Sequence, residues 1–246
     1  MASNYIRDTL KTVDYDRYFI SLFFAQELRE ALWALFLFHH EIAKTRFVVT
    51  ETQLGLIRLQ WWREEIDKLY KGGDAPDNPV LVALDNLIRE YALPQALFEN
   101  LIYAHEFDLE GVSPTGMQGV ESYADLTTTP LNKLALHIIG EKPEQEAVQL
   151  ISIQYTLLKL YMRRSMYASH DFVLIPDELS GDVQKYLIEQ DLNSDDSVYL
   201  RAHKALCDIY LKKLQQHNFD TSKEVAENAA KFKGLRVWLN VMFKRR

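Results

Sequence analysis

The spacing of apolar residues limits the possible folds more than any other feature of this sequence. Along most of the chain these residues recur every three or four positions, which is the period of a helix with one buried face. The alternation that marks β-strands is absent from the sequence, and it contains only 9 Gly and 7 Pro. The chain is therefore predicted to be all-α.

The apolar period predicts a series of helices separated by short loops. The first strong case covers residues 18–38, and Pro130 falls inside a later helix as a kink or break. Loops are predicted over residues 71–79, 111–119 and 171–182. No loop is long enough to force a boundary, so residues 1–246 are predicted to form one helical domain. The other predicted helices cover residues 52–69, 80–91, 94–110, 122–139, 144–169, 199–216 and 222–243.

Composition narrows the possible functions. A chain of 246 residues with 48% hydrophobic content can bury a sizeable core. The formal net charge of −7 disfavours general nucleic-acid binding, and we expect no nucleic-acid partner. Cys207 is the single cysteine, which excludes an internal disulfide framework and a cysteine-rich zinc site. A single thiol fits a reducing compartment.

The sequence also bears on location. Residues 1–11 lack the apolar run of a secretory signal and the Arg-rich character of an import leader. The longest apolar stretch, residues 31–38, is far too short to cross a bilayer. We expect a cytoplasmic protein, with peripheral contact at the inner face of the membrane as the closest attachment to lipid.

Four segments, taken in order, resemble the squalene/phytoene synthase family. Residues 16–18 read Asp-Arg-Tyr, and residues 29–38 read Arg-Glu-Ala-Leu-Trp-Ala-Leu-Phe-Leu-Phe. Residues 57–64, Ile-Arg-Leu-Gln-Trp-Trp-Arg-Glu, carry the sharpest likeness, and residues 172–179 are similar to a stretch that follows the family's second acidic motif. The chain is most similar to the non-catalytic branch that contains the mitochondrial complex I assembly factor. The resemblance implies a single helical bundle of the isoprenoid-synthase type with a central cavity.

Enzymes of this family join two prenyl diphosphates head to head, and the resemblance sets a clear electrostatic requirement. The diphosphates carry several negative charges, and Mg²⁺ ions bridge them to carboxylates. The family supplies these carboxylates from two aspartate-rich motifs on facing helices, one turn apart in each motif.

Neither motif has its carboxylates in this sequence. In the first window, residues 39–47, the aspartate positions fall on Ala43, Lys44 and Phe47, and Glu41 is the only carboxylate. In the second window the positions fall on Arg163 and on Met166 or Tyr167. No carboxylate occurs between Gln149 and His170.

Cations and apolar residues occupy the two windows instead. Such a site would repel Mg²⁺ but could bind a phosphate directly. We therefore expect no catalytic residue, no metal site and no cofactor, with Mg²⁺ needed only by an active enzyme. The candidates for a ligand- or anion-binding cavity are Glu41, Lys44, Arg46, Arg58, Arg63, Arg163, Arg164 and Tyr167.

Two polar runs near the first helices favour structural roles. Adjacent residues on a helix point about 100° apart, so His39 and His40 cannot easily share one metal ion. Satisfied or exposed histidines are the favoured interpretation. Asp16, Arg17 and Tyr18 are expected to fix the first helix by capping and pairing, because Asp is a good N-cap.

The arginine-rich positions leave alternatives open. One of Trp61 and Trp62 is expected in the core, with Arg63 paired to a nearby acid; the alternative is that Arg58 and Arg63 face the cavity. One arginine of residues 163–164 either reaches solvent along its stem or holds an anion in the cavity. A buried arginine there would need a carboxylate partner, for which Glu41 and Asp108 are candidates.

The C-terminal residues 231–246 are basic in an acidic chain. Their pattern suits an interfacial helix on anionic lipid, and equally a last helix docked on the core. The membrane-contact candidates are the apolar residues that share one helical face, with the cations that follow them: Leu235, Trp238, Leu239, Met242, Lys244 and Arg245.

Three hypotheses follow. The first is a catalytically inactive protein that acts as an assembly factor or as an isoprenoid- or lipid-binding factor; the resemblance implies a protein partner in respiratory complex I assembly. The second is a Mg²⁺-dependent prenyl-diphosphate transferase with a degenerate metal site. The third is a peripheral membrane interaction protein without a ligand.

Overall fold

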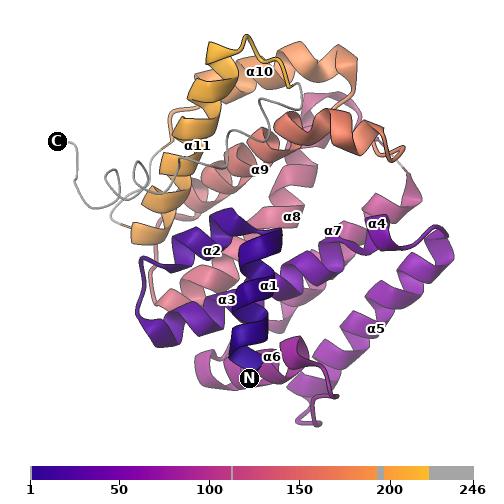
Figure 1. Cartoon of the computed structure of the whole chain (residues 1–246), viewed down its shortest axis with the longest axis vertical. Helices are drawn as coiled ribbons and strands as arrows, with labels where there is room; N and C mark the ends of the chain where they lie inside the picture. The colour runs from indigo at the N-terminus through magenta and orange to yellow at the C-terminus, as the bar shows by residue number, and fades with distance from the viewer. Residues whose placement is uncertain (1, 112, 193–196, 222–246) are drawn as a thin grey trace. The chain divides into compact units, whose positions relative to one another are not determined.

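The computed structural model describes residues 2–111, 113–192 and 197–221, and in these ranges it contains helices and no strand (Figure 1). The all-α prediction is confirmed. The elements in chain order are α1 (Ala2–Val13), α2 (Tyr15–Ser21), α3 (Gln26–Ala43), α4 (Thr45–Val48), α5 (Thr52–Tyr70), α6 (Pro79–Tyr91), α7 (Gln95–Glu110), α8 (Gly116–Ile139), α9 (Gln145–Ala168), a 3-10 turn (Asp177–Leu179), α10 (Ser180–Glu189) and α11 (Val198–Gln216).

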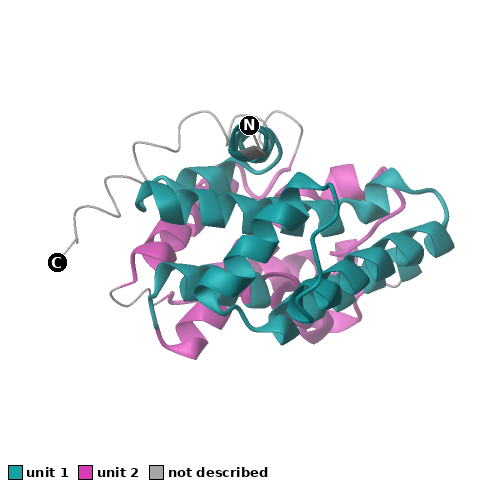
Figure 2. Ribbon diagram, turned by 90° about the horizontal axis from the view of Figure 1, so that it is seen from below, with its two compact units in different colours: residues 1–110, 130–142 teal, residues 111–129, 143–246 magenta. Residues whose placement is uncertain are grey.

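The chain divides into two compact units, coloured separately in Figure 2. Unit 1 comprises residues 1–110 and 130–142, and unit 2 comprises residues 111–129 and 143–246. The division falls at Pro130 inside α8, where the missing proline N–H removes one helical hydrogen bond. The helix nevertheless continues through this position as a single element. One domain over residues 1–246 stays a prediction.

Unit 1 is built around α3. Every residue of α3 from Ala31 to His39 is buried, because α1, α2, α6 and α7 all pack on this helix. A helix that is apolar all round is stable only at the centre of a core. Beside it, α5 packs on α7 at very close range: a Cβ added at Gly55 would lie 2.6 Å from a methyl carbon of Leu109. A larger residue at position 55 would therefore have to displace the Leu109 side chain where these two helices meet.

Unit 2 is built around α9, whose residues from Ile151 to Leu158 are all buried. α10 and α11 pack on this helix, and the first part of α8 is tied to it by a hydrogen bond of 2.6 Å between Thr156 and Thr128. The Gln154 side chain donates to the backbone carbonyl of Leu187 in α10, at 2.8 Å. These bonds satisfy polar groups that burial would otherwise penalise.

The helix predicted over residues 18–38 is wrong in one respect, since the structure breaks it between α2 and α3. Arg29 explains the break: its guanidinium donates to the carbonyls of Phe24 at 2.7 Å and Leu22 at 3.3 Å. These carbonyls would otherwise lack partners at the end of a helix. The cap of α2 is Asp14, whose side chain accepts from the backbone N–H of Arg17, so the expected capping role of Asp16 is wrong.

Other boundaries differ by smaller amounts. The sequence prediction missed α1, the short α4 and α10, and it placed the start of α8 at residue 122 instead of Gly116. The loop predicted over residues 171–182 is correct only up to the 3-10 turn. Gly140 ends α8 as predicted, with φ at +78°. The helix predicted over residues 222–243 lies outside the described residues.

Candidate functional site

The first motif window lies at the junction of α3 and α4, and its only carboxylate is already shared by two cations. Glu41 accepts from the Lys44 ammonium at 2.6 Å and from the Arg58 guanidinium of α5 at 3.1 Å. The Glu41 side chain is 17% exposed, and those of Lys44 and Arg58 about twice as much. Because one carboxylate pairs with two cations, these three residues together carry a net positive charge.

This arrangement does not fit the magnesium ions that the resemblance implies. A Mg²⁺ site needs carboxylate oxygens that are free to turn toward the ion. Glu41 has both oxygens engaged, one by the Lys44 ammonium and the other by the Arg58 guanidinium. Within residues 2–111, 113–192 and 197–221, no cluster of three or more His, Cys, Asp or Glu could hold a metal ion.

A buried polar chain runs beside this window through unit 1. Arg17 donates to Asp14 at 2.9 Å and to Nδ1 of His39 at 3.2 Å. Because arginine has no acceptor, Nδ1 of His39 must accept, which places the proton of a neutral ring on Nε2. The His39 ring packs on the His105 ring, centroids 5.4 Å apart, and His105 Nδ1 lies 2.7 Å from Asp108. The chain joins α2, α3 and α7.

The tryptophan–arginine run of α5 takes the structural role favoured from the sequence. Trp62 is 2% exposed and packs edge-on against Phe38, whereas Trp61 is 38% exposed. Arg63 donates to Glu106 of α7 at 2.6 Å. The prediction of one buried tryptophan and one acid-paired arginine is confirmed.

The second motif window lies at the end of α9, in unit 2. Arg164 is half-buried and donates to three hydroxyl groups: Ser180 at 2.7 Å, Tyr161 at 3.2 Å and Thr221 at 3.3 Å. Its guanidinium also stacks 4.6 Å from the centre of the Tyr161 ring. All of these partners are neutral, so none of them cancels the charge of the guanidinium. Arg163, by contrast, is exposed, as the solvent-reaching alternative predicted for one of this pair.

A pocket of about 420 Å³ opens beside Arg164. Its wall is about equally polar and apolar, and the Asp177 carboxylate lies on it. A cation beside apolar side chains such as Leu160 and Ile175 suits an amphipathic anion, although the Asp177 carboxylate opposes it. The lining residues are Leu160, Arg164, Ser165, Tyr167, Ala168, Val173, Leu174, Ile175 and Asp177.

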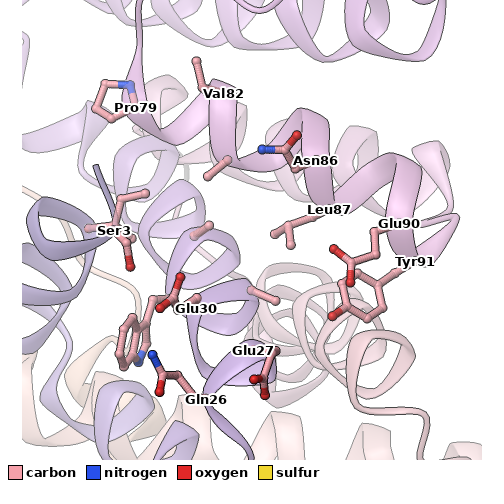
Figure 3. Close-up of a pocket in the computed structure, with 15 residues that line it drawn as sticks. Ser3, Gln26, Glu27, Glu30, Pro79, Val82, Asn86, Leu87, Glu90 and Tyr91 are labelled. Carbon is pink, nitrogen blue, oxygen red and sulfur yellow. The ribbon is translucent and has the colours of Figure 1, made fainter. Parts of the chain in front are cut away.

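Unit 1 contains a second pocket, of about 450 Å³, between α1, α3 and α6 (Figure 3). Glu27, Glu30 and Glu90 line it together with small residues such as Ala34. Burial raises the pKa of the Tyr91 phenol in this pocket, and the negative charge of Glu90, with a smaller effect of Glu27, raises it further. The pocket is therefore electronegative, the opposite of a phosphate site, and the sequence interpretation did not identify it.

The structure brings together some of the residues predicted to form a site. Glu41, Lys44 and Arg58 form one cluster, with the half-buried Arg46 following in α4. Arg63 belongs to a separate pair with Glu106. Arg164 and Tyr167 line one pocket in unit 2. Glu41 and Asp108, proposed as partners for a buried arginine of α9, are instead paired within unit 1.

Sequence reasoning missed the buried roles of His105 and Asp108. Their spacing of three residues on a helix is a usable signal, since such side chains are neighbours. Nothing in the sequence shows that this pair meets His39, because that contact joins two helices. The C-terminal membrane candidates, Leu235 to Arg245, lie outside the described residues, and no helix within those residues is long and apolar enough to span a membrane.

Comparison with known proteins gives a family match and named relatives. The sequence profile described as squalene/phytoene synthase matches residues 10–154, more than half of the chain. A bovine protein named "NADH dehydrogenase (ubiquinone) complex I, assembly factor 6" is 27% identical over 89% of this chain and 75% of its own length. The mouse protein of that name is 30% identical over 56% of this chain, and the matched part spans 41% of the mouse protein.

Solved structures show the same fold. A dehydrosqualene synthase crystallised with a ligand matches with a TM-score of 0.75 at 11% identity, over 98% of this chain and 95% of that one. A squalene synthase from Alicyclobacillus acidocaldarius matches with a TM-score of 0.65 at 13% identity, over 96% and 92%. The predicted isoprenoid-synthase fold type is confirmed, while the predicted central cavity stays a prediction.

The buried polar chain yields a stability prediction. Replacing Arg17 with Met removes a cation whose side chain is 7% exposed and leaves Asp14 and His39 without this donor. We expect the free energy of unfolding to fall by about 2–4 kcal/mol, measured by urea denaturation. Arg7→Met is the matched control, because Arg7 pairs with Asp8 at the surface, and it should leave the denaturation midpoint unchanged. Equal effects of the two changes would contradict a structural role for the chain.

Proposed function

The chain belongs to the squalene/phytoene synthase family, and we propose that it is a non-catalytic member that acts as an assembly factor for respiratory complex I. The relatives that are 26–30% identical over their aligned segments bear the name of complex I assembly factor 6 or of its homologue. Most of these alignments cover about two fifths of the relative's length. The function named for the full-length relatives is therefore proposed for this chain.

One observation carries the non-catalytic part of the proposal. At the first motif, Lys44 stands at an aspartate position and shares Glu41 with Arg58. Moving Glu41 to a magnesium ion would break both ion pairs and leave two cations beside the metal. Electrostatic repulsion then opposes the binding that prenyl-diphosphate chemistry needs. The prenyltransferase alternative requires another source of carboxylates.

The proposed partners and location follow from this role. An assembly factor binds a protein partner, and we propose one among the subunits or intermediates of complex I. We place the protein in the cytoplasm, in peripheral contact with the inner face of the membrane. No cofactor is required for such a role, since binding and release of a partner involve no bond chemistry.

A second function, binding of an amphipathic anion, is supported by the pocket beside Arg164. Among the described residues the guanidinium donates to neutral hydroxyl groups, and an anionic head group would bind it directly despite the Asp177 carboxylate on the same wall. The apolar wall formed by Leu160, Val173 and Ile175 would take an isoprenoid or lipid chain. This ligand would bind by direct phosphate contact, without a bridging metal.

The assembly role predicts a loss of complex I when the gene is deleted in the source organism. We expect less fully assembled complex on native gels and lower NADH:ubiquinone oxidoreductase activity, both restored by the wild-type gene. Glu41→Gln should restore them too, because the role needs no metal ligand, and the lost ion pairs should lower the free energy of unfolding by only about 1 kcal/mol.

Two results would contradict the assembly role. One is a normal amount of assembled complex in the deletion strain. The other is failure of a folded Glu41→Gln protein to restore assembly, which would indicate that this carboxylate has a chemical task.

The ligand function predicts that Arg164 selects for a charged head group. Isothermal titration with farnesyl phosphate should show binding to the wild-type protein, and Arg164→Gln should weaken it about tenfold, as expected for the loss of a charge-assisted hydrogen bond. Farnesol, the uncharged probe, should not distinguish the two proteins. The matched control is Lys204→Gln, which removes an exposed cation paired with Asp208. Equal affinity of all three proteins for farnesyl phosphate would exclude Arg164 from the site.

A further inference from the structure

Five large apolar side chains are exposed within fifteen residues of unit 1. They lie on α4 and on the first half of α5, and each is more than a third exposed. The exposed fractions are 41% for Phe47, 56% for Val48, 51% for Leu54, 57% for Ile57 and 38% for Trp61. Single exposed apolar residues are ordinary on protein surfaces, but a group of this kind marks an interaction site.

The three residues from α5 form one stripe. At 100° per residue, Leu54, Ile57 and Trp61 fall within about 60° of one another around the helix axis. The buried Leu59 lies on the opposite side of the helix, and the buried Trp62 lies about 80–140° from the three stripe residues. The stripe is therefore not a displaced part of the core. It is a second apolar face on a helix whose first face is already buried.

Positive charge gathers at the same place. Residues 41–61 carry three cations, Lys44, Arg46 and Arg58, against two carboxylates, Glu41 and Glu51, in a chain whose net charge is −7. Lys44 and Arg58 share Glu41, and the exposed Glu64 follows one turn after Trp61, so the positive charge lies at the α4 end of this face. An apolar face with cations at its edge is complementary to the surface of a lipid bilayer, which has anionic head groups outside and apolar acyl chains beneath them.

We propose that α4 and the first half of α5 form a membrane-contact face that lies on a bilayer containing anionic lipids. Leu54 and Ile57 would enter the boundary between head groups and acyl chains, and Trp61 would sit at head-group depth, where its indole has both apolar and polar surroundings. Lys44, Arg46 and Arg58 would face lipid phosphates.

A lipid surface fits this face better than a protein partner. Interfacial helices lie flat with one apolar stripe down and cations beside it, which is the pattern of α5 and of the neighbouring α4. Protein interfaces are depleted in lysine and enclose their apolar core in a polar rim. The inference deepens the peripheral membrane contact proposed above, and it does not rest on the assembly role, because its test uses the purified protein and lipid alone.

The test is vesicle flotation with the full-length protein. Wild-type protein should float with vesicles of phosphatidylcholine mixed with phosphatidylglycerol, and less with pure phosphatidylcholine. The triple variant Leu54→Ser/Ile57→Ser/Trp61→Ser should partition at least about tenfold more weakly, since three apolar side chains lose their burial. Added salt should weaken binding of the wild-type protein, because it screens the cations.

Two further variants serve as controls. Tyr5→Ser/Val82→Ser/Tyr103→Ser replaces three comparably exposed apolar side chains elsewhere in unit 1 and should bind as wild type does. Trp238→Ser/Leu239→Ser tests the basic C-terminal segment separately. Circular dichroism and thermal unfolding should show that all variants remain folded, because each replaced side chain in unit 1 is exposed.

Four results would overturn the proposal. They are absence of flotation by the wild-type protein, unchanged flotation of the Leu54/Ile57/Trp61 variant, an equal loss in the Tyr5/Val82/Tyr103 control, and loss only in the Trp238/Leu239 variant. Light scattering tests whether a second copy of the chain occupies this face instead. If the wild-type protein is a dimer, the Leu54/Ile57/Trp61 variant is a monomer and flotation is unchanged, the face is a dimer interface and not a membrane-contact face.

Discussion

Glu41 and its two cations determine what the first motif window can do. In a carboxylate-rich window the oxygens repel one another until a metal ion binds, and that repulsion drives the binding. Here the single carboxylate is stabilised by Lys44 at 2.6 Å and by Arg58 at 3.1 Å, so its charge is balanced without a metal. The helices therefore keep the family's fold, but this window now carries more cationic than anionic side chains and does not attract a metal cation.

The second window shows the same reversal by a different arrangement. Arg164 is held by three hydroxyl groups and stacks on Tyr161, which fixes the guanidinium without neutralising it. Unit 1 adds two surfaces that the windows do not predict: an electronegative pocket around Glu27, Glu30 and Glu90, and the apolar face on α4 and α5. Within the part of the chain that the structure describes, no group of three or more His, Cys, Asp or Glu side chains could hold a metal ion.

Much of this could be predicted from the sequence, and what was missed has physical reasons. Apolar period located α5, α6, α7, α9 and α11 to within one or two residues, because it reflects burial of one helix face. It failed between α2 and α3, where Arg29 captures two carbonyls and breaks a continuous apolar run. The absence of the family's carboxylates could be predicted from the sequence of the two motif windows. The contact of His39 with His105 was not, because no local pattern encodes which helices meet.

The absence of metal-dependent chemistry is the central claim, and diphosphate release measures it most directly. Purified protein would be incubated with farnesyl or geranylgeranyl diphosphate and Mg²⁺, with and without a chelator, alongside an active dehydrosqualene synthase. We predict that the protein releases diphosphate at the rate of the protein-free background, whether or not the chelator is present. Release above background that the chelator abolishes would contradict the account, because it would show that these two windows still assemble a working magnesium site.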